Sequence, residues 1–167
     1  MPGLPSILGP GLRLVLCGTA VGAQSASRGH YYAGRGNQFW RLLHDAGLTP
    51  TLLSPEDDRT LPDYGIGLTD LAPGITQSHD RGLRYDTDAL ARAMDDHAPR
   101  VLAFTSLTGG RAAARAFGAP KPDLGRQPWA VGPAAVWVLP SSSGANNAVP
   151  YATKLAVWRQ LADDLRR

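Results

Sequence analysis

The segment Leu12–Cys17 is an apolar run that lacks the alternation of polar and apolar residues found in a half-exposed strand. Such a run is typical of a strand buried on both faces, as in a parallel sheet that helices cover on two sides. Three more short apolar runs follow along the chain, at Ile66–Leu71, Val101–Thr105 and Ala135–Leu139. Strands of this kind need helices on both faces of their sheet, so we expect an α/β fold.

Segments with helical patterns separate these runs. In Asn37–Ala46 the apolar residues recur at helical spacing, and the pattern stops at Gly47. Ser54-Pro55-Glu56-Asp57 indicates a helix start, with an N-cap residue, a proline at the first helical position and acidic residues in the first turn. Further helices are predicted at Asp86–His97, Thr108–Phe117 and Tyr151–Leu165. Strands that alternate with helices predict a three-layer α/β/α sandwich with a short central parallel sheet.

The length of 167 residues suits one domain with a sizeable core. We therefore assign residues 1–167 to a single domain, with an irregular lead-in at Met1–Gly11 and a long loop at Pro120–Pro133. No apolar run approaches the roughly 20 residues that span a bilayer. The lead-in also lacks the cationic and long apolar segments of an export signal. We expect an intracellular, cytoplasmic protein without a membrane partner.

The cysteine content excludes two kinds of site, and the charge content leaves one kind of ligand open. Cys17 is the single cysteine and lies in the first predicted strand, so we expect a small core residue and no disulfide framework or thiol-based metal site. The net charge is +3, and Lys121 and Lys154 are the only lysines beside many arginines. Arginine suits phosphate recognition. The same bias also arises from a GC-rich genome, so composition alone leaves nucleic-acid binding open.

Three loops follow predicted strands, at Gly18–Gly36, Asp70–Leu83 and Ser141–Val149. In a parallel sheet all three open on the same edge, where such folds bind ligands. The first loop supplies backbone amides and aromatic rings, the second a carboxylate, and the third a group of hydroxyls. Because its two glycines let the backbone approach a ligand and its tyrosines offer flat faces, the first loop predicts a pocket for a planar ring.

Five short elements in these regions resemble one family in residue type and in order. They are Gly18-Thr19-Ala20-Val21-Gly22, Tyr32, Asn37-x-Phe39-Trp40, Gly67-Leu68-Thr69-Asp70-Leu71 and Leu139-Pro140-Ser141-Ser142-Ser143. Together they resemble the mismatch-specific uracil/thymine DNA glycosylases, over most of the chain from Leu12 to about Val149. The resemblance implies a uracil-DNA glycosylase fold and hydrolysis of the bond between a flipped base and its deoxyribose, without metal or cofactor. It also implies a monomer that works in base excision repair on DNA, within a bacterial-type nucleoid.

The first element departs from the family at one position. Family members typically have Gly-Ile-Asn-Pro-Gly there, and the asparagine orients the attacking water, whereas this sequence has Ala20. We expect Asp70 to take over this role, because a carboxylate can accept a proton from water and stabilise a cationic sugar. The alternative is that Asp70 caps a loop or pairs with an arginine. Asp63, Asp80 and Asp86 lie in turns or at a helix cap and are weaker candidates.

The other site residues are carried over from the resemblance. The family stacks an aromatic ring on the flipped pyrimidine at the position of Tyr32, and backbone groups near Thr19 and Ala23 are expected to bind the base edge. Asn37 matches a pocket-side asparagine of the family but could equally cap the following helix. The predicted base-binding set is Thr19, Ala20, Ala23, Tyr32 and Asn37. We expect Tyr31, Phe39 and Trp40 to be core residues, and His30 to be a loop residue that could donate a hydrogen bond.

The serine-rich segment is the family's second motif in a triple-serine form. Its hydroxyls and amides can bind phosphates without reading sequence. The predicted DNA-binding set is Ser141, Ser142, Ser143, Gly144, Ala145 and Asn146. Relatives place a bulky or charged residue after this motif to fill the gap left by the flipped base, whereas this chain has small residues there. We therefore expect weak dependence on the opposite base and good activity on single strands.

These observations favour a monofunctional glycosylase that removes uracil from mismatched or single-stranded DNA, with thymine and other damaged pyrimidines as further substrates. Two alternatives stay open. The first is a nucleic-acid-binding member of the same fold that lost catalysis together with the asparagine. The second is an unrelated small α/β nucleotide-binding or hydrolase domain. No metal-ligand spacing points to a metal site.

Overall fold

The computed structural model describes residues 3–72, 85–145 and 148–167. Five strands form one sheet in the order β2-β1-β3-β5-β4. The strands are β1 (Leu14–Gly18), β2 (Ile66–Asp70), β3 (Val101–Phe104), β4 (Gly125–Val131) and β5 (Ala134–Val138). The four strands from β2 to β5 in this order run parallel, and β4 pairs antiparallel with β5 at the edge. The parallel sheet expected from the apolar runs is therefore present, with β1 at its centre.

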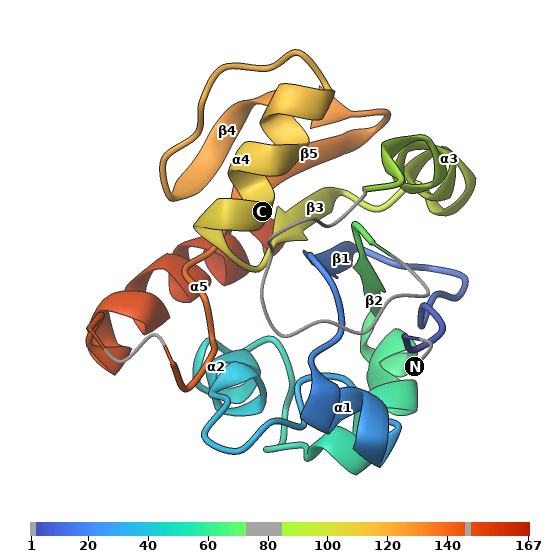
Figure 1. Ribbon diagram of the computed structural model, residues 1–167. Helices are drawn as coiled ribbons and strands as arrows, with labels where there is room; N and C mark the ends of the chain where they lie inside the picture. Colours follow the sequence, from blue (N-terminus) through green and yellow to red (C-terminus); the bar gives the residue numbers. More distant parts are fainter. Residues whose placement is uncertain (1–2, 73–84, 146–147) are drawn as a thin grey trace.

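Helices cover both faces of this sheet (Figure 1). They are α1 (Ala23–Arg28), α2 (Phe39–Asp45), the 3-10 helix η1 (Pro55–Tyr64), α3 (Thr87–His97), α4 (Leu107–Ala116) and α5 (Tyr151–Leu165). On one face, α2, α5 and η1 share a core cluster with the sheet. On the other face, α3 and α4 form a second cluster. The expected three-layer α/β/α sandwich is confirmed.

The central strand shows why the sequence has no alternation. Leu14 and Leu16 belong to the cluster under α2 and α5, whereas Val15 and Cys17 belong to the cluster under α3 and α4. Both faces of β1 are thus buried and both need apolar side chains. Cys17 is a core residue, as expected, and burial followed by the charge of Asp70 raises the pKa of its thiol.

The loop expected at Pro120–Pro133 is wrong in part, because it contains β4. Its proline and glycine content indicated a loop, but an edge strand tolerates Pro128 since one side of its backbone faces no partner strand. The side chains of β4 alternate between half-buried and exposed, so the segment also lacks a continuous apolar run. The sheet is consequently mixed at this edge.

Two further segments differ from expectation. The loop Gly18–Gly36 contains α1, a helix too short and too polar to show apolar periodicity, which ends at Gly29 in the left-handed conformation. The helix start at Ser54 leads into the 3-10 helix η1, with Ser54 as N-cap and Pro55 in the first turn as predicted, and a capping box between Ser54 and Asp57 in addition. In the irregular lead-in, Ile7 exchanges two backbone hydrogen bonds with Leu68 and so covers the free edge of β2.

None of the helices in the described part of the chain is long and apolar enough to cross a membrane.

Candidate active site

The carboxyl ends of the four parallel strands surround one pocket of about 560 Å³. Asp70 ends β2, Gly18 ends β1, Thr105 follows β3, and the serine segment follows β5. The lining residues used below are Gly18, Thr19, Ala20, Ala23, Tyr31, Tyr32, Asn37, Asp70, Thr105, Ser106 and Ser141 to Ala145. The sheet edge therefore gathers Asp70 and parts of the first and third predicted loops at one place, as expected for parallel strands, while residues 73–83 of the second loop lie outside the described residues.

Gly18 forms the floor, and three polar groups meet above it. A methyl group on its Cα would lie 2.7 Å from Oδ1 of Asp70, 3.3 Å from the hydroxyl of Tyr32 and 3.7 Å from Oγ1 of Thr105. Any larger residue at this position would displace the carboxylate. Gly18 and Asp70 are direct partners in the parallel register of β1 and β2, so strand pairing itself brings the carboxylate to this point.

Asp70 is buried, with 7% of its surface exposed. Desolvation raises the pKa of its carboxyl to about 7, against a smaller opposing effect of the Tyr31 hydroxyl. No ion pair to Asp70 is present within the described residues. The alternative that Asp70 pairs with an arginine is therefore not realised there. A carboxyl with this pKa can both release and accept a proton near neutral pH.

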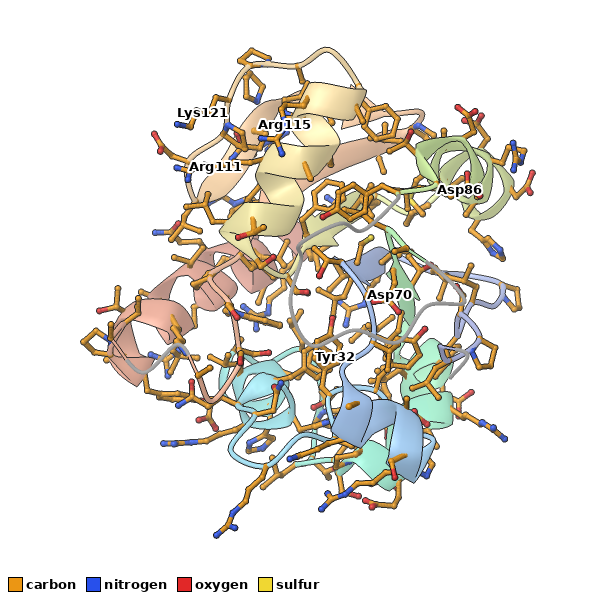
Figure 2. The ribbon with its side chains drawn as sticks, in the orientation of Figure 1. Tyr32, Asp70, Asp86, Arg111, Arg115 and Lys121 are labelled. Atoms are coloured by element: carbon orange, nitrogen blue, oxygen red, sulfur yellow. The ribbon has the colours of Figure 1, made fainter. Side chains whose placement is uncertain are left out.

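Tyr32 lies beside Asp70 in the pocket wall, and Figure 2 shows the two labelled residues close to the centre of the molecule. Its ring stacks on Phe39 with centroids 3.8 Å apart and 11° between the planes. Its hydroxyl forms a 3.0 Å hydrogen bond with the hydroxyl of Thr105. Because Phe39 covers one face of the ring, only the other face is available to a ligand. Burial raises the pKa of Tyr32, so its hydroxyl keeps its proton.

The backbone of Tyr32 has φ of 51°, a left-handed conformation that is uncommon outside glycine. Its neighbours hold it in place. The Tyr31 amide donates to a carboxylate oxygen of the buried Asp58 at 3.0 Å, and the Tyr31 hydroxyl donates to the carbonyl of Pro5 at 3.1 Å. Tyr31 is a buried core residue, as expected. Such local strain is found where surrounding contacts impose the conformation, often at functional sites.

His30 also contacts Asp58, the carboxylate that holds the Tyr31 amide, because its Nδ1 lies 3.2 Å from Asp58 Oδ1. The histidine is half-buried and is not among the pocket residues. It thus supports the loop that carries Tyr31 and Tyr32. Phe39 and Trp40 are core residues, as predicted.

Asn37 lines the pocket and also bonds to the start of α2. Its Oδ1 accepts a hydrogen bond from the Phe39 amide at 2.9 Å. Asn37 thus lies at the pocket wall and bonds to the first amide of α2, although Gln38 and not Asn37 occupies the N-cap position. The carboxamide oxygen accepts from the Phe39 amide, while the side chain remains at the pocket wall.

A buried lysine anchors the wall between α2 and the serine segment. Lys154 is fully buried, and its ammonium donates to Oε1 of Gln38 at 2.9 Å. The amide of Gln38 in turn donates to the carbonyl of Ser142 at 2.9 Å. Burial lowers the pKa of Lys154. This chain of contacts was not expected from the sequence, because a lysine on an amphipathic helix usually faces water.

The serine segment bonds mainly to itself. Ser141 Oγ accepts from the Ser143 amide and Ser143 Oγ accepts from the Ala145 amide, each at 3.2 Å. Gly144 packs directly on the turn at the opposite rim, since a methyl group on it would lie 3.1 Å from the carbonyl carbon and oxygen of Gly36. A larger side chain at this position would therefore collide with the backbone of Gly36. Asn146 lies outside the described residues.

The structure thus brings Asp70, all five predicted base-binding residues and Ser141 to Ala145 to one pocket. The carbonyl of Thr19 accepts a hydrogen bond from the Ala72 amide at 2.7 Å, so this backbone oxygen already has one partner. Asp63 lies in η1 and Asp86 caps α3, and neither lines the pocket, while Asp80 lies outside the described residues. The methyl side chain of Ala20 provides no polar group to the wall.

Sequence reasoning missed Thr105 and Ser106. Thr105 Oγ1 contacts both the Tyr32 hydroxyl and, at 3.4 Å, the carbonyl of Cys17. Ser106 caps α4 by accepting from the Gly109 amide. A signal for both existed, because they follow the third apolar strand just as Asp70 follows the second.

The arrangement combines a flat aromatic face, a desolvated carboxyl and small hydroxyl residues at the rim. No group of three His, Cys, Asp or Glu side chains within the described residues could hold a metal ion. Among the described lining residues, Asp70 is the one acidic side chain. Such a pocket can accept a planar ring and act on a bond next to it.

Two comparisons with known proteins agree with this geometry. The sequence profile of the Uracil DNA glycosylase superfamily matches residues 5–162. Among solved structures, the solution NMR structure of a candidate uracil DNA glycosylase from Methanosarcina acetivorans is similar to this chain, with a TM-score of 0.65 and 24% sequence identity. The match covers 99% of this chain and 98% of that protein. At this level of identity the second comparison shows a shared fold.

Proposed function

The chain belongs to the uracil DNA glycosylase superfamily, and we propose that it removes uracil from DNA with Asp70 as its catalytic carboxylate. The observation that carries this proposal is the burial of Asp70 beside Tyr32 at the pocket floor, with a carboxyl pKa of about 7. Superfamily membership supports a glycosylase acting on DNA. Preference for mismatched or single-stranded uracil is part of the proposal and rests on the small residues that follow Ser143.

The proposed reaction begins with a flipped nucleotide. The uracil ring stacks on the open face of Tyr32, and stacking of this kind contributes about 1–3 kcal/mol per base. Backbone groups of the Thr19–Ala23 segment bind the edge of the base. Asn37 lies in the same wall and has further hydrogen-bonding groups on its carboxamide. The serine segment contacts the phosphates at the rim.

Hydrolysis then replaces one bond at the sugar. The bond between C1′ and N1 breaks and its electron pair leaves with the base, so the sugar gains the character of an oxocarbenium ion. The ionised carboxylate of Asp70 stabilises this cation, and a water oxygen bonds to C1′ while Asp70 takes its proton. Ala20 stands where family members have an asparagine that orients the attacking water, and a methyl group cannot do this. In this proposal Asp70 takes over that role.

An excision assay tests the proposal. Oligonucleotides with one uracil, single-stranded or opposite guanine, are incubated with the protein and then treated with alkali, which breaks the strand at an abasic site. We expect strand breakage with the wild-type protein and a loss of about 10²–10⁴-fold in rate for Asp70→Asn, the usual range for removing a general base. Asp63→Asn is the matched control, since Asp63 is an exposed carboxylate away from the pocket.

The outcomes separate the proposal from its alternatives. Wild-type cleavage at the same rate as Asp70→Asn would contradict the role of Asp70. Binding of uracil-containing DNA without breakage would favour a binding module, the reading that Ala20 supports. If the protein neither binds nor cleaves the uracil-containing DNA, a DNA substrate would be contradicted.

A further inference from the structure

The surface of α4 carries positive charge that forms no ion pair with an acidic side chain in residues 3–72, 85–145 and 148–167. Arg111 and Arg115 lie four residues apart and so share one side of α4, and Lys121 follows in the segment that leads to β4. We call these three residues the α4 cationic patch. Figure 2 shows them gathered around α4 and the segment beside it. The chain has no acidic residue between Leu107 and Pro122.

Three other arginines form ion pairs with acidic side chains. Arg126 pairs with Asp164, Arg166 with Asp163, and Arg41 with Asp45. In the described part of the chain the patch residues form no ion pair, and Nε of Arg111 is buried without a hydrogen-bond partner. Their charges are therefore available to an anionic ligand at this surface.

The acidic residues concentrate on other elements. They lie mainly in η1 and in α3 with its cap, at Glu56, Asp57, Asp58, Asp63, Asp86, Asp88, Asp95 and Asp96. In Figure 1, α3 lies at the right of the view, away from α4 and α5. A polyanion is thus repelled by η1 and α3 and attracted by α4.

The pocket and the patch are joined by α4 itself. Ser106 lines the pocket and caps this helix, so α4 starts at the pocket wall. With a rise of about 1.5 Å per residue, Arg111 lies about 7 Å and Arg115 about 14 Å along the helix from Ser106. DNA carries one phosphate per about 3.4 Å of axis on each strand, so these distances correspond to about two and four nucleotides.

We propose that the α4 cationic patch binds backbone phosphates of the DNA that flanks the extruded nucleotide, two to four positions away. The inference rests on the proposed function, because it takes DNA with a flipped base as the ligand of the neighbouring pocket. Contacts of this kind position the substrate without reading its sequence. Arginine and lysine contribute to affinity here by releasing the counterions of the phosphates they neutralise.

The test compares two triple variants with equal loss of charge. The first is Arg111→Gln, Arg115→Gln, Lys121→Gln, and the control is Arg59→Gln, Arg92→Gln, Arg167→Gln, whose arginines are exposed. On a uracil-containing duplex of about 25 base pairs we expect the patch variant to raise KM at least tenfold with kcat unchanged. Its slope of log Kd against log salt should fall by about 2–3, at roughly 0.9 per lost phosphate contact. The control should change KM less than threefold.

A trinucleotide with a central uracil supplies the second measurement. Because it is too short to reach α4, the patch variant should cleave it as well as the wild type does. Equal salt slopes for the wild type and both variants would overturn the inference, as would an equal loss on the duplex and the trinucleotide. Salt slopes are also measured on uracil-free duplex, so a wild-type protein without excision activity would contradict the proposed function and still leave the patch testable.

Discussion

The floor of the pocket and its serine rim lie at the same edge of one sheet, yet their polar groups are in opposite situations. At the floor, Asp70 is buried and has no ion pair in the described chain, and its pKa is raised. At the rim, Ser141 and Ser143 accept hydrogen bonds from amides of their own segment. At the floor, exclusion of water thus raises the proton affinity of the Asp70 carboxyl. At the rim, the ordered hydroxyls and amides of the serine segment remain suited to a solvated ligand.

The largest expected effect concerns the stability of the floor. The carboxyl of Asp70 has a folded pKa of about 7, above its ordinary value of 3.8. Folding therefore favours the protonated carboxyl. The contribution of this protonated carboxyl to the stability of the folded protein is fully present below about pH 4 and is lost as the pH rises through 7. Asp70→Asn stays neutral and should therefore be more stable than the wild type at pH 8, by up to about 4 kcal/mol.

Urea unfolding at pH 4.5 and pH 8 measures this difference. The advantage of Asp70→Asn should shrink toward the lower pH, because at pH 4.5 the carboxyl of the folded wild type is protonated and no buried negative charge remains. Asp63→Asn serves as the control, since Asp63 is exposed, and should show no such pH-dependent gain. An Asp70→Asn protein without added stability at pH 8 would mean that the floor is as well solvated as the rim.

The pH dependence of excision is the next largest effect. If the ionised Asp70 acts on water, kcat/KM should rise about tenfold per pH unit below 7 and level off above it, about 100-fold between pH 5 and pH 8. Single-turnover rates on a uracil-containing oligonucleotide measure this profile. The residual rate of Asp70→Asn should be flat over the same range. A flat wild-type profile would assign the chemistry to a group other than Asp70.

Removal of the aromatic face comes third. Tyr32→Ala deletes the stacking surface and should lower kcat/KM about 10- to 100-fold, which corresponds to about 1–3 kcal/mol of lost stacking. Tyr32→Phe keeps the ring and loses the hydrogen bond to Thr105, so its loss should stay within a few fold. Steady-state kinetics on the same oligonucleotide compare the two variants. Equal losses would show that the hydroxyl matters and the ring does not.

The smallest effect is expected at the rim. In Gly144→Ala the new methyl group would press on the carbonyl of Gly36 at 3.1 Å, so the serine segment must shift by a few tenths of an ångström. We expect a two- to fivefold increase in KM with kcat unchanged. Gly34→Ala is the control, because its methyl group would meet only Gln24 Oε1 at an ordinary 3.6 Å. A large fall in kcat for Gly144→Ala would show that the rim takes part in the chemistry.

Much of the fold could be predicted from local patterns. The buried strands and the long helices are encoded by residues that are close in sequence, so α5 matches its predicted bounds and the four parallel strands match within two residues. The elements that were missed have weak local signals. The short helix α1 has no apolar stripe, and β4 is an edge strand that tolerates Pro128.

The pocket was predicted in part. A common rule, that loops at the carboxyl ends of parallel strands meet, is sufficient to predict that Asp70, Tyr32 and the serine segment lie together. The same rule was not applied to Thr105 and Ser106, which also line the pocket. The anchoring of Ser142 through Gln38 and Lys154 joins residues more than 100 positions apart, and no local pattern reports such a contact.

The sequence by itself determined the parallel sheet, its helical layers and the kind of residues at each strand end, because strand and helix periodicity and loop chemistry are local properties. Only the tertiary structure decided the electrostatic state of the site. The pKa of Asp70 depends on how completely the chain excludes water from it, and that exclusion comes from Gly18, Tyr32 and other residues far apart in sequence. The same holds for α4, whose arginines form no ion pair in the described part of the chain, where most acidic residues lie in η1 and in α3 with its cap.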